Sequence, residues 1–212
     1  MKKLLLLAFV LTSIITHAQE NSEKLTIDKG TWNVSGDISL HFSNTESNNN
    51  NVEQDEFGFS FAPKIGYAIN DNLILGLGIG YGHYKQDTTS NTNQQTTVNT
   101  NSYHVFPYVR KFFPVGEKMA FLVQGEARFS KQKSDYDETF MNTSSDSESV
   151  FAGIRPGFTY FISDKIALET TIGALGYNYS EGEQSDGYYS KRNGFRFDFN
   201  TSNIIFGVSI YL

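Results

Sequence analysis

The sequence predicts an all-β protein, an eight-stranded antiparallel up-and-down transmembrane β-barrel. Three observations predict it: eight segments in which apolar and polar residues alternate, a regular alternation of short and long connections between them, and an N-terminal segment of the kind that directs export. Each alternating segment has about ten or more residues, which is enough for a tilted strand to cross a bilayer.

The first eighteen residues have the layout of a secretory signal peptide. Lys2 and Lys3 precede an apolar stretch that begins at Leu4, and Thr16 and Ala18 supply the small residues of a cleavage site. The apolar stretch is shorter than the ~20 residues that a spanning helix needs. We therefore expect residues 1–18 to be removed, residues 19–30 to form a polar periplasmic lead-in and residues 31–212 to form the barrel.

Composition and charge exclude several classes of protein. The chain contains no cysteine, which excludes a disulfide scaffold and a lipid anchor attached to cysteine. Without Lys2 and Lys3 the mature chain keeps 15 of its 17 basic residues against 23 acidic ones, a net charge of −8. This balance argues against nucleic acid as a partner, because phosphate binding needs a basic face. We expect no cofactor.

The eight alternating segments each place apolar side chains on one face and small or polar side chains on the other. They are residues 32–42, 57–69, 73–84, 103–113, 119–129, 150–161, 166–179 and 202–212. Ahead of the last segment, Phe195, Phe197 and Phe199 also alternate, but in the opposite phase. The change of phase predicts a bulge or break near residues 200–203.

The connections alternate in length. Residues 70–72, 114–118 and 163–165 are short and rich in turn formers, whereas long polar stretches join the other ends of the strands. The long stretches are residues 43–56, 85–102, 130–149 and 180–194. In outer-membrane barrels short turns face the periplasm and long loops face outside, so both chain ends are expected on the periplasmic side.

Prolines mark a repeat of hairpin length. Pro63, Pro107 and Pro156 each lie seven residues before a short turn, so three hairpins align with one another. A proline lacks the N–H that a neighbouring strand would bind, and a closed barrel has no free edge to accommodate it. We expect a bulge or an unpaired carbonyl at each of the three.

The polar face decides which side of the barrel meets lipid. Small residues and seven charged ones occupy it, as expected for the narrow lumen of an eight-stranded barrel rather than for a surface in water. The predicted lumen charge network consists of Asp37, Lys64, Arg110, Glu126, Arg128, Arg155 and Glu169. We expect it to be a structural plug and not a conducting path, because open channels need about 16 strands.

The apolar face is expected to contact lipid, with aromatic residues at the two membrane interfaces. The candidate interfacial aromatics are Trp32, Tyr67, Tyr81, Tyr103, Tyr160 and Tyr177. The alternative, a secreted soluble ligand-binding barrel, would turn the apolar face inward.

The mature chain resembles the bacterial outer-membrane β-barrel domain family, the small porin-family proteins, over residues 31–212. The resemblance rests on the signal peptide, the hairpins that run from Pro63 to Tyr67 and from Pro156 to Tyr160, the segment 106–110 (FPYVR) and the ending 203–212 (NIIFGVSIYL). It implies an outer-membrane location, contact with outer-membrane lipid and lipopolysaccharide, and recognition of the last strand by the barrel-insertion machinery. The family usually ends on an aromatic residue, whereas this chain ends on Leu212 after Tyr211.

Catalytic and metal-binding signals are weak. His41 and His104 fall on the polar face near the outer rim, with Ser39 and Ser102 as conceivable nucleophiles, but no motif links them. Two histidines are too few for a metal site, and the carboxylates of the long polar stretches lack the spacing of a calcium loop.

We therefore expect a non-enzymatic, monomeric integral outer-membrane protein. Its roles would be membrane integrity or surface interaction through long extracellular loops, with at most weak permeability to small solutes. A lipid-modifying outer-membrane enzyme, such as a lipid A deacylase or acyltransferase, is the alternative, ahead of the soluble barrel.

Overall fold

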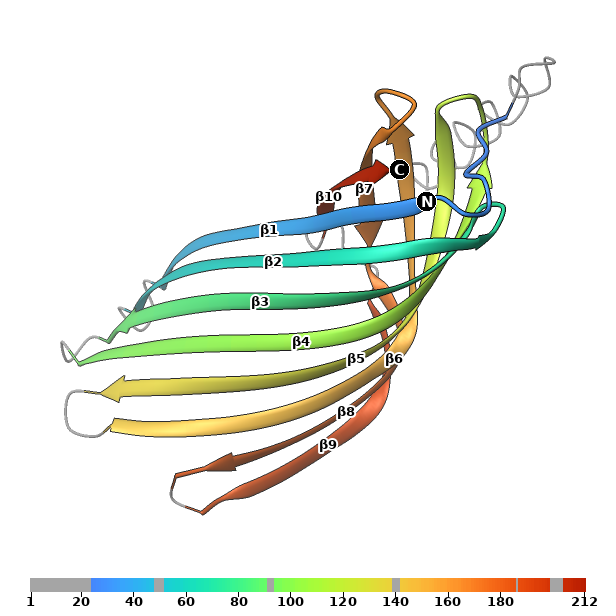
Figure 1. Cartoon of the computed structure of the whole chain (residues 1–212). Helices are drawn as coiled ribbons and strands as arrows, with labels where there is room; N and C mark the ends of the chain where they lie inside the picture. Colours follow the sequence, from blue (N-terminus) through green and yellow to red (C-terminus); the bar gives the residue numbers. More distant parts are fainter. Residues whose placement is uncertain (1–23, 48–51, 91–93, 139–141, 186, 199–203) are drawn as a thin grey trace, which may run out of the picture.

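The computed structural model describes residues 24–47, 52–90, 94–138, 142–185, 187–198 and 204–212 (Figure 1). The expected signal peptide and the break expected at residues 200–203 lie outside these residues. The described strands are β1 (Trp32–Ser47), β2 (Val52–Asn70), β3 (Leu73–Thr89), β4 (Gln95–Pro114), β5 (Met119–Glu138), β6 (Asn142–Phe161), β7 (Ile166–Ile172), β8 (Ala174–Gln184), β9 (Tyr189–Asp198) and β10 (Ile204–Tyr211). No helix in the described part of the chain is long and apolar enough to cross a membrane.

Antiparallel pairing closes the strands into a ring of eight. β1 to β7 pair in chain order, β7 pairs with β10, and β10 pairs with β1. β8 continues the seventh barrel strand beyond Gly173, and β9 pairs with β8 as the outer part of the eighth. Both ends of the described chain lie at the end of the barrel that carries the β2–β3 turn (Figure 1). The predicted eight-stranded up-and-down barrel is confirmed.

The strands are longer than the sequence predicted. β4, β5 and β6 have 20 residues each, so they span roughly 65 Å at ~3.3 Å per residue. Most of the polar stretches predicted as loops are paired strand: Thr89 of β3 faces Gln95 of β4 across the hairpin. Cross-strand bonds between polar side chains hold these extensions, for example Thr97 Oγ1 donating to Asp87 Oδ1 at 2.7 Å. The prediction of long loops there is wrong, because threonine and paired polar residues also form strands.

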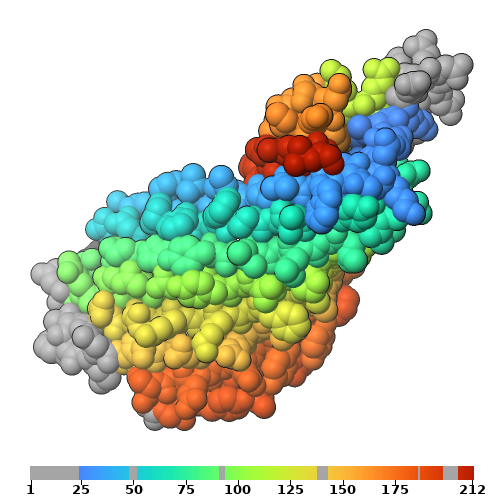
Figure 2. All heavy atoms as spheres, in the orientation of Figure 1, coloured from blue at the N-terminus to red at the C-terminus, as the bar shows by residue number. Residues whose placement is uncertain are grey.

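The barrel carries its apolar side chains on the outside. Large apolar residues on the outer face of every barrel strand are exposed, including Leu75, Leu77 and Ile79 of β3. The strands follow one another in chain order across the face in Figure 2. On β1, β4, β5 and β6 the outward apolar residues span about eleven residues, and the polar extensions continue beyond this band. A band of this length suits the hydrocarbon core of a bilayer.

Small residues on the inner face make room for large ones opposite. Gly76 and Gly78 of β3 lie directly against the rings of Tyr108 and Phe106 of β4. These rings belong to a buried cluster at the end of the lumen that carries the short turns, which also contains Ile74, Phe112 and Leu122. We call this the periplasmic end, because short turns are expected to face the periplasm. The lumen is therefore filled by its own side chains at this end.

The pairing is interrupted at the three strand prolines, as expected. β3 pairs with β2 on both sides of Pro63 but not at it. In the same way, β5 pairs with β4 on both sides of Pro107 but not at it. At Pro156 the seventh barrel strand contains one extra residue, beside Gly173, whose φ is +68°. This bulge separates β7 from β8.

The segment before β1 crosses the periplasmic mouth. Ile27 is only 4% exposed and packs into the buried cluster. Its N–H donates to Asn72 Oδ1 and its carbonyl accepts from the Asn72 N–H, both at 2.9 Å. Leu25 N donates to Gly116 O at 2.9 Å. The described part of the polar lead-in is thus tied to two periplasmic turns, which its sequence did not suggest.

Candidate functional site

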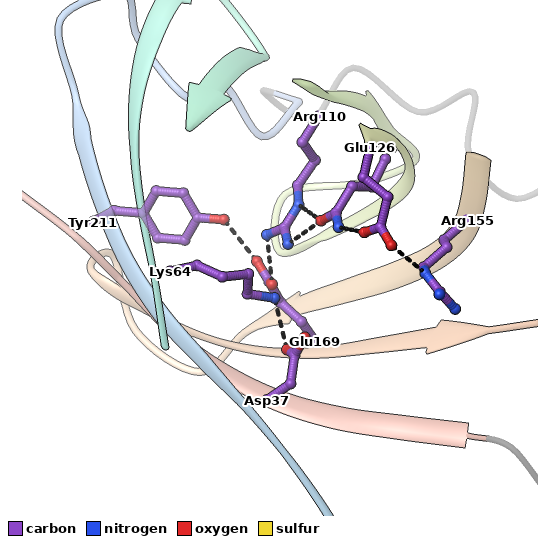
Figure 3. A network of polar contacts seen from close by, with 8 residues as sticks. Asp37, Lys64, Arg110, Glu126, Arg155, Glu169 and Tyr211 are labelled. Atoms are coloured by element: carbon purple, nitrogen blue, oxygen red, sulfur yellow. Dashed lines mark hydrogen bonds and ion pairs between the residues drawn. The ribbon is translucent and has the colours of Figure 1, made fainter. Parts of the chain in front are cut away.

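A chain of polar contacts crosses the lumen just above the buried apolar cluster (Figure 3). Arg110 of β4 donates from Nη1 to Glu169 Oε2 of β7 at 2.7 Å, and from Nη2 to Gln124 Oε1 of β5 at 2.7 Å. Gln124 Nε2 in turn donates to Glu126 Oε2 at 2.7 Å. Tyr211 of β10 donates from its hydroxyl to Glu169 Oε1 at 3.0 Å. The chain therefore joins strands on opposite sides of the ring.

Three further contacts complete the network. Glu126 Oε1 accepts from Arg128 Nε at 3.1 Å and from Arg155 Nε of β6 at 3.0 Å. Lys64 Nζ of β2 donates to Asp37 Oδ1 of β1 at 2.7 Å. All seven charged residues singled out in the sequence thus lie in the lumen, where each has a partner of opposite charge.

Burial makes these pairings important for stability. The Arg110 and Glu169 side chains are almost completely buried, and a buried charge that lacks a partner costs several kcal/mol. Glu126 serves two arginines, so four cations share three carboxylates. The network therefore keeps an excess of positive charge on the outer side of the lumen, where Arg128 and Arg155 lie.

Gln124 and Tyr211 belong to this network although no feature of the sequence selected them. Each occupies a position in the apolar–polar alternation that places its side chain on the inner face of the barrel. This position was the signal that the sequence offered. Their role depends on which strands face one another across the lumen.

The six candidate interfacial aromatics lie on the outside at two levels. Trp32 and Tyr67 form a pair near the periplasmic end with ring centroids 5.1 Å apart. Tyr81 and Tyr103 form a second pair toward the outer end at 5.3 Å. Tyr160 lies near the periplasmic end, and Tyr177 lies toward the outer end. Residues of this kind suit the two membrane interfaces.

The rim histidines His41 and His104 make contacts with different partners. His41 Nε2 lies 2.9 Å from Glu56 Oε2, and this hydrogen bond lowers the pKa of Glu56 below its usual value. His104 packs its ring against Phe106 with centroids 6.1 Å apart. Within the described residues no hydrogen bond joins His41 or His104 to a serine, and no cluster of three or more His, Asp or Glu side chains is arranged to hold a metal ion.

Comparison with known proteins places the chain in a family. Solved structures similar to it include a major outer membrane protein of Thermus thermophilus (12% identity, TM-score 0.48) and Neisserial surface protein A (20% identity, TM-score 0.43). Each match covers 86% of this chain and 99% of the other. Among curated proteins no sequence matches the chain. The family model of the outer membrane protein beta-barrel domain matches residues 4–210. The chain therefore belongs to the outer membrane protein beta-barrel domain family.

Proposed function

We propose that this outer-membrane barrel is a non-enzymatic protein whose lumen is closed to solutes and whose polar hairpins act at the cell surface. The observation that carries the proposal is the chain of contacts through Arg110, which is fully buried and bonded across the lumen to Glu169 and Gln124. Solute movement would require these buried ion pairs to separate, and breaking a buried pair is strongly unfavourable. The charged residues therefore act as a structural plug.

The plug is supported from the periplasmic side. Ile27 fills the mouth, and the rings of Tyr108 and Phe112 fill the lumen between the mouth and the charges. An eight-stranded barrel is just wide enough for its own side chains. Permeability is thus negligible in this proposal.

The polar extensions supply the surface role. They continue the strands beyond the apolar band as paired ribbons rich in Ser, Thr and Asn, so they project from the membrane as ordered surfaces. Exposed polar residues on a rigid scaffold are a common setting for binding. We propose surface interaction, with support of the membrane as the second role of a monomeric barrel that contacts outer-membrane lipid and lipopolysaccharide.

Insertion would follow from the last strand. β10 closes the ring by pairing with both β7 and β1. In this proposal the barrel-insertion machinery recognises β10 before these pairings close the ring.

The lipid-modifying enzyme has no further support in the geometry. Nucleophilic catalysis needs a hydroxyl within reach of its base, whereas the ring of His41 bonds to a glutamate on the neighbouring strand.

Planar-bilayer recording tests the closed lumen. The purified protein, shown to be folded by its heat-modifiable migration, is expected to give no stepwise conductance at voltages where a porin of about 16 strands in the same bilayer conducts. Regular conductance steps from the folded protein would contradict the plug, because the ion pairs around Arg110 would then fail to block the lumen.

A further inference from the structure

The ring is closed in its periplasmic half, but its outer half has a seam. β1 pairs with β10 from Asn33 to Ile38, and from Ser39 onward it pairs with β2 alone. β9 pairs with β8 alone. In the part of the chain that the structure describes, no ladder joins β9 to β1, and these two strands are the edges of the curved outer sheet in Figure 1.

An unpaired strand edge is costly at membrane depth. Backbone N–H and C=O groups without partners are tolerated there only where they are buried in protein or line a water-filled cavity. Leu40 and Phe42 are exposed outward apolar residues of the membrane-facing band, so the start of the unpaired edge of β1 lies at that depth. The seam therefore needs a polar environment behind it.

A cavity of about 850 Å³ provides that environment. Its walls include inward-facing Arg128 and Arg155 together with outward-facing Ile38, Leu40 and Phe206. Residues of both faces line one space, so the cavity lies at the seam, between the lumen and the outer surface. Its volume is within the roughly 300–1,000 Å³ of pockets that hold small molecules.

The inner part of this cavity favours an anion. Arg128, Arg155, Arg196 and His41 line it, and none of the described residues that line it is acidic. Arg128 and Arg155 share the single carboxylate of Glu126, and their side chains keep 22% and 20% exposure. Arg196 makes no ion pair within the described residues. Guanidinium groups bind carboxylate and phosphate through charge-assisted hydrogen bonds.

The outer part of the cavity favours hydrocarbon. Ile38 of β1 lies opposite Phe206 of β10 in the strand register, and Leu40 follows on the same face. On the β9 side Phe195 and Phe197 are 74% and 73% exposed, among the most exposed apolar side chains of the barrel. These residues lie in the outer half of the apolar band, where acyl chains of the outer leaflet would meet them.

We propose that the seam between β1 and β9 is a lateral binding slot for an anionic lipid. The carboxylate or phosphate of the lipid binds among Arg128, Arg155 and Arg196, and its acyl chain leaves the barrel between Leu40 and the phenylalanines of β9. This inference goes beyond the proposed surface role and does not depend on it, because the slot lies on the outer side of the plug.

Binding of a fluorescent polyene fatty acid to the folded protein, in an uncharged detergent, tests the ligand class. Oleate is expected to displace the probe, oleyl alcohol to require at least about tenfold more, and acetate and inorganic phosphate to be ineffective. Equal displacement by oleyl alcohol would remove the anion site. Displacement by acetate or phosphate would show a site for free anions instead of lipid, and the absence of saturable binding would overturn the proposal altogether.

Two variants of one strand test the location. Arg196→Gln is expected to weaken fatty-acid binding about tenfold. Arg192→Gln, on the same strand and face but outside the cavity lining, is the matched control and is expected to bind like the wild type. Heat-modifiable migration confirms that both variants fold. Equal affinities in the two variants would place the site elsewhere.

Photo-crosslinking of the wild-type protein keeps the proposal testable without any substitution. A fatty acid with a diazirine in its chain is expected to label the peptides of Leu40 and Phe206 in preference to the peptide of Leu77, which is outward-facing but distant in strand order. Excess oleate should abolish this preference. Uniform labelling around the barrel would contradict a slot.

Discussion

Replacing Gly78 with valine is expected to prevent the barrel from reaching its folded, heat-modifiable form. A Cβ at this position would overlap the Phe106 ring. The ring cannot move easily, because it is fully buried and the guanidinium of Arg128 lies 4.2 Å from its centroid. Overpacking typically costs ~1–3 kcal/mol, and a β-branched side chain in this position should reach or exceed that range.

The matched controls separate packing from a general effect of losing a glycine. Gly116→Val is expected to fold normally, since nothing lies within 4 Å of a Cβ built there. Combining Gly78→Val with Phe106→Ala should restore part of the folded fraction by removing the ring. The lumen packing would be contradicted if Gly78→Val migrated as a folded barrel with the yield of the wild type.

Replacing Arg110 with methionine is expected to lower the free energy of unfolding by about 3–5 kcal/mol, because it leaves the buried carboxylate of Glu169 without its cation. Reversible urea unfolding in lipid vesicles, followed by the fluorescence of Trp32, measures the change. Trp32 is the only tryptophan of the chain, so the signal comes from one site.

A double variant shows how much of this loss belongs to the pair. Arg110→Met combined with Glu169→Met should be more stable than Arg110→Met alone, since no uncompensated charge remains. Lys131→Met is the exposed counterpart: Lys131 bonds to Glu148 at 3.2 Å with both side chains largely exposed, and it should cost at most ~1 kcal/mol. If the loss of the double variant equalled the sum of the losses of Arg110→Met and Glu169→Met measured separately, the two residues would not be coupled.

The barrel and its sidedness were predictable because lipid imposes a pattern. Outward Leu77 alternates with inward Gly78, and a charge such as Arg110 cannot face acyl chains without a large cost. The short turns were also predictable, because they are rich in turn formers such as asparagine, which tolerates a positive φ better than most residues. Asn72 adopts such a φ, at 57°.

Other features depend on contacts that no local pattern contains. The polar hairpins lack strict alternation, so their pairing beyond the membrane could not be told from irregular loops. Ile27 is one of only two apolar residues in the polar segment 19–30, and only the shape of the mouth selects it. The seam depends on the pairing of several strands at once, since β7 gives way to β8 at Gly173, β9 pairs with β8, and β10 pairs with β7 and β1.

The central claim is that the apolar face contacts acyl chains, and depth-dependent quenching of tryptophan by brominated lipids tests it most directly. In a protein that carries Trp32→Phe and Leu77→Trp, bromine atoms deep in the acyl chains should quench strongly and aqueous iodide should not. In the wild type, Trp32 at the interface should respond most to bromine near the head groups. Quenching of the tryptophan at position 77 by iodide but not by any brominated lipid would contradict the account.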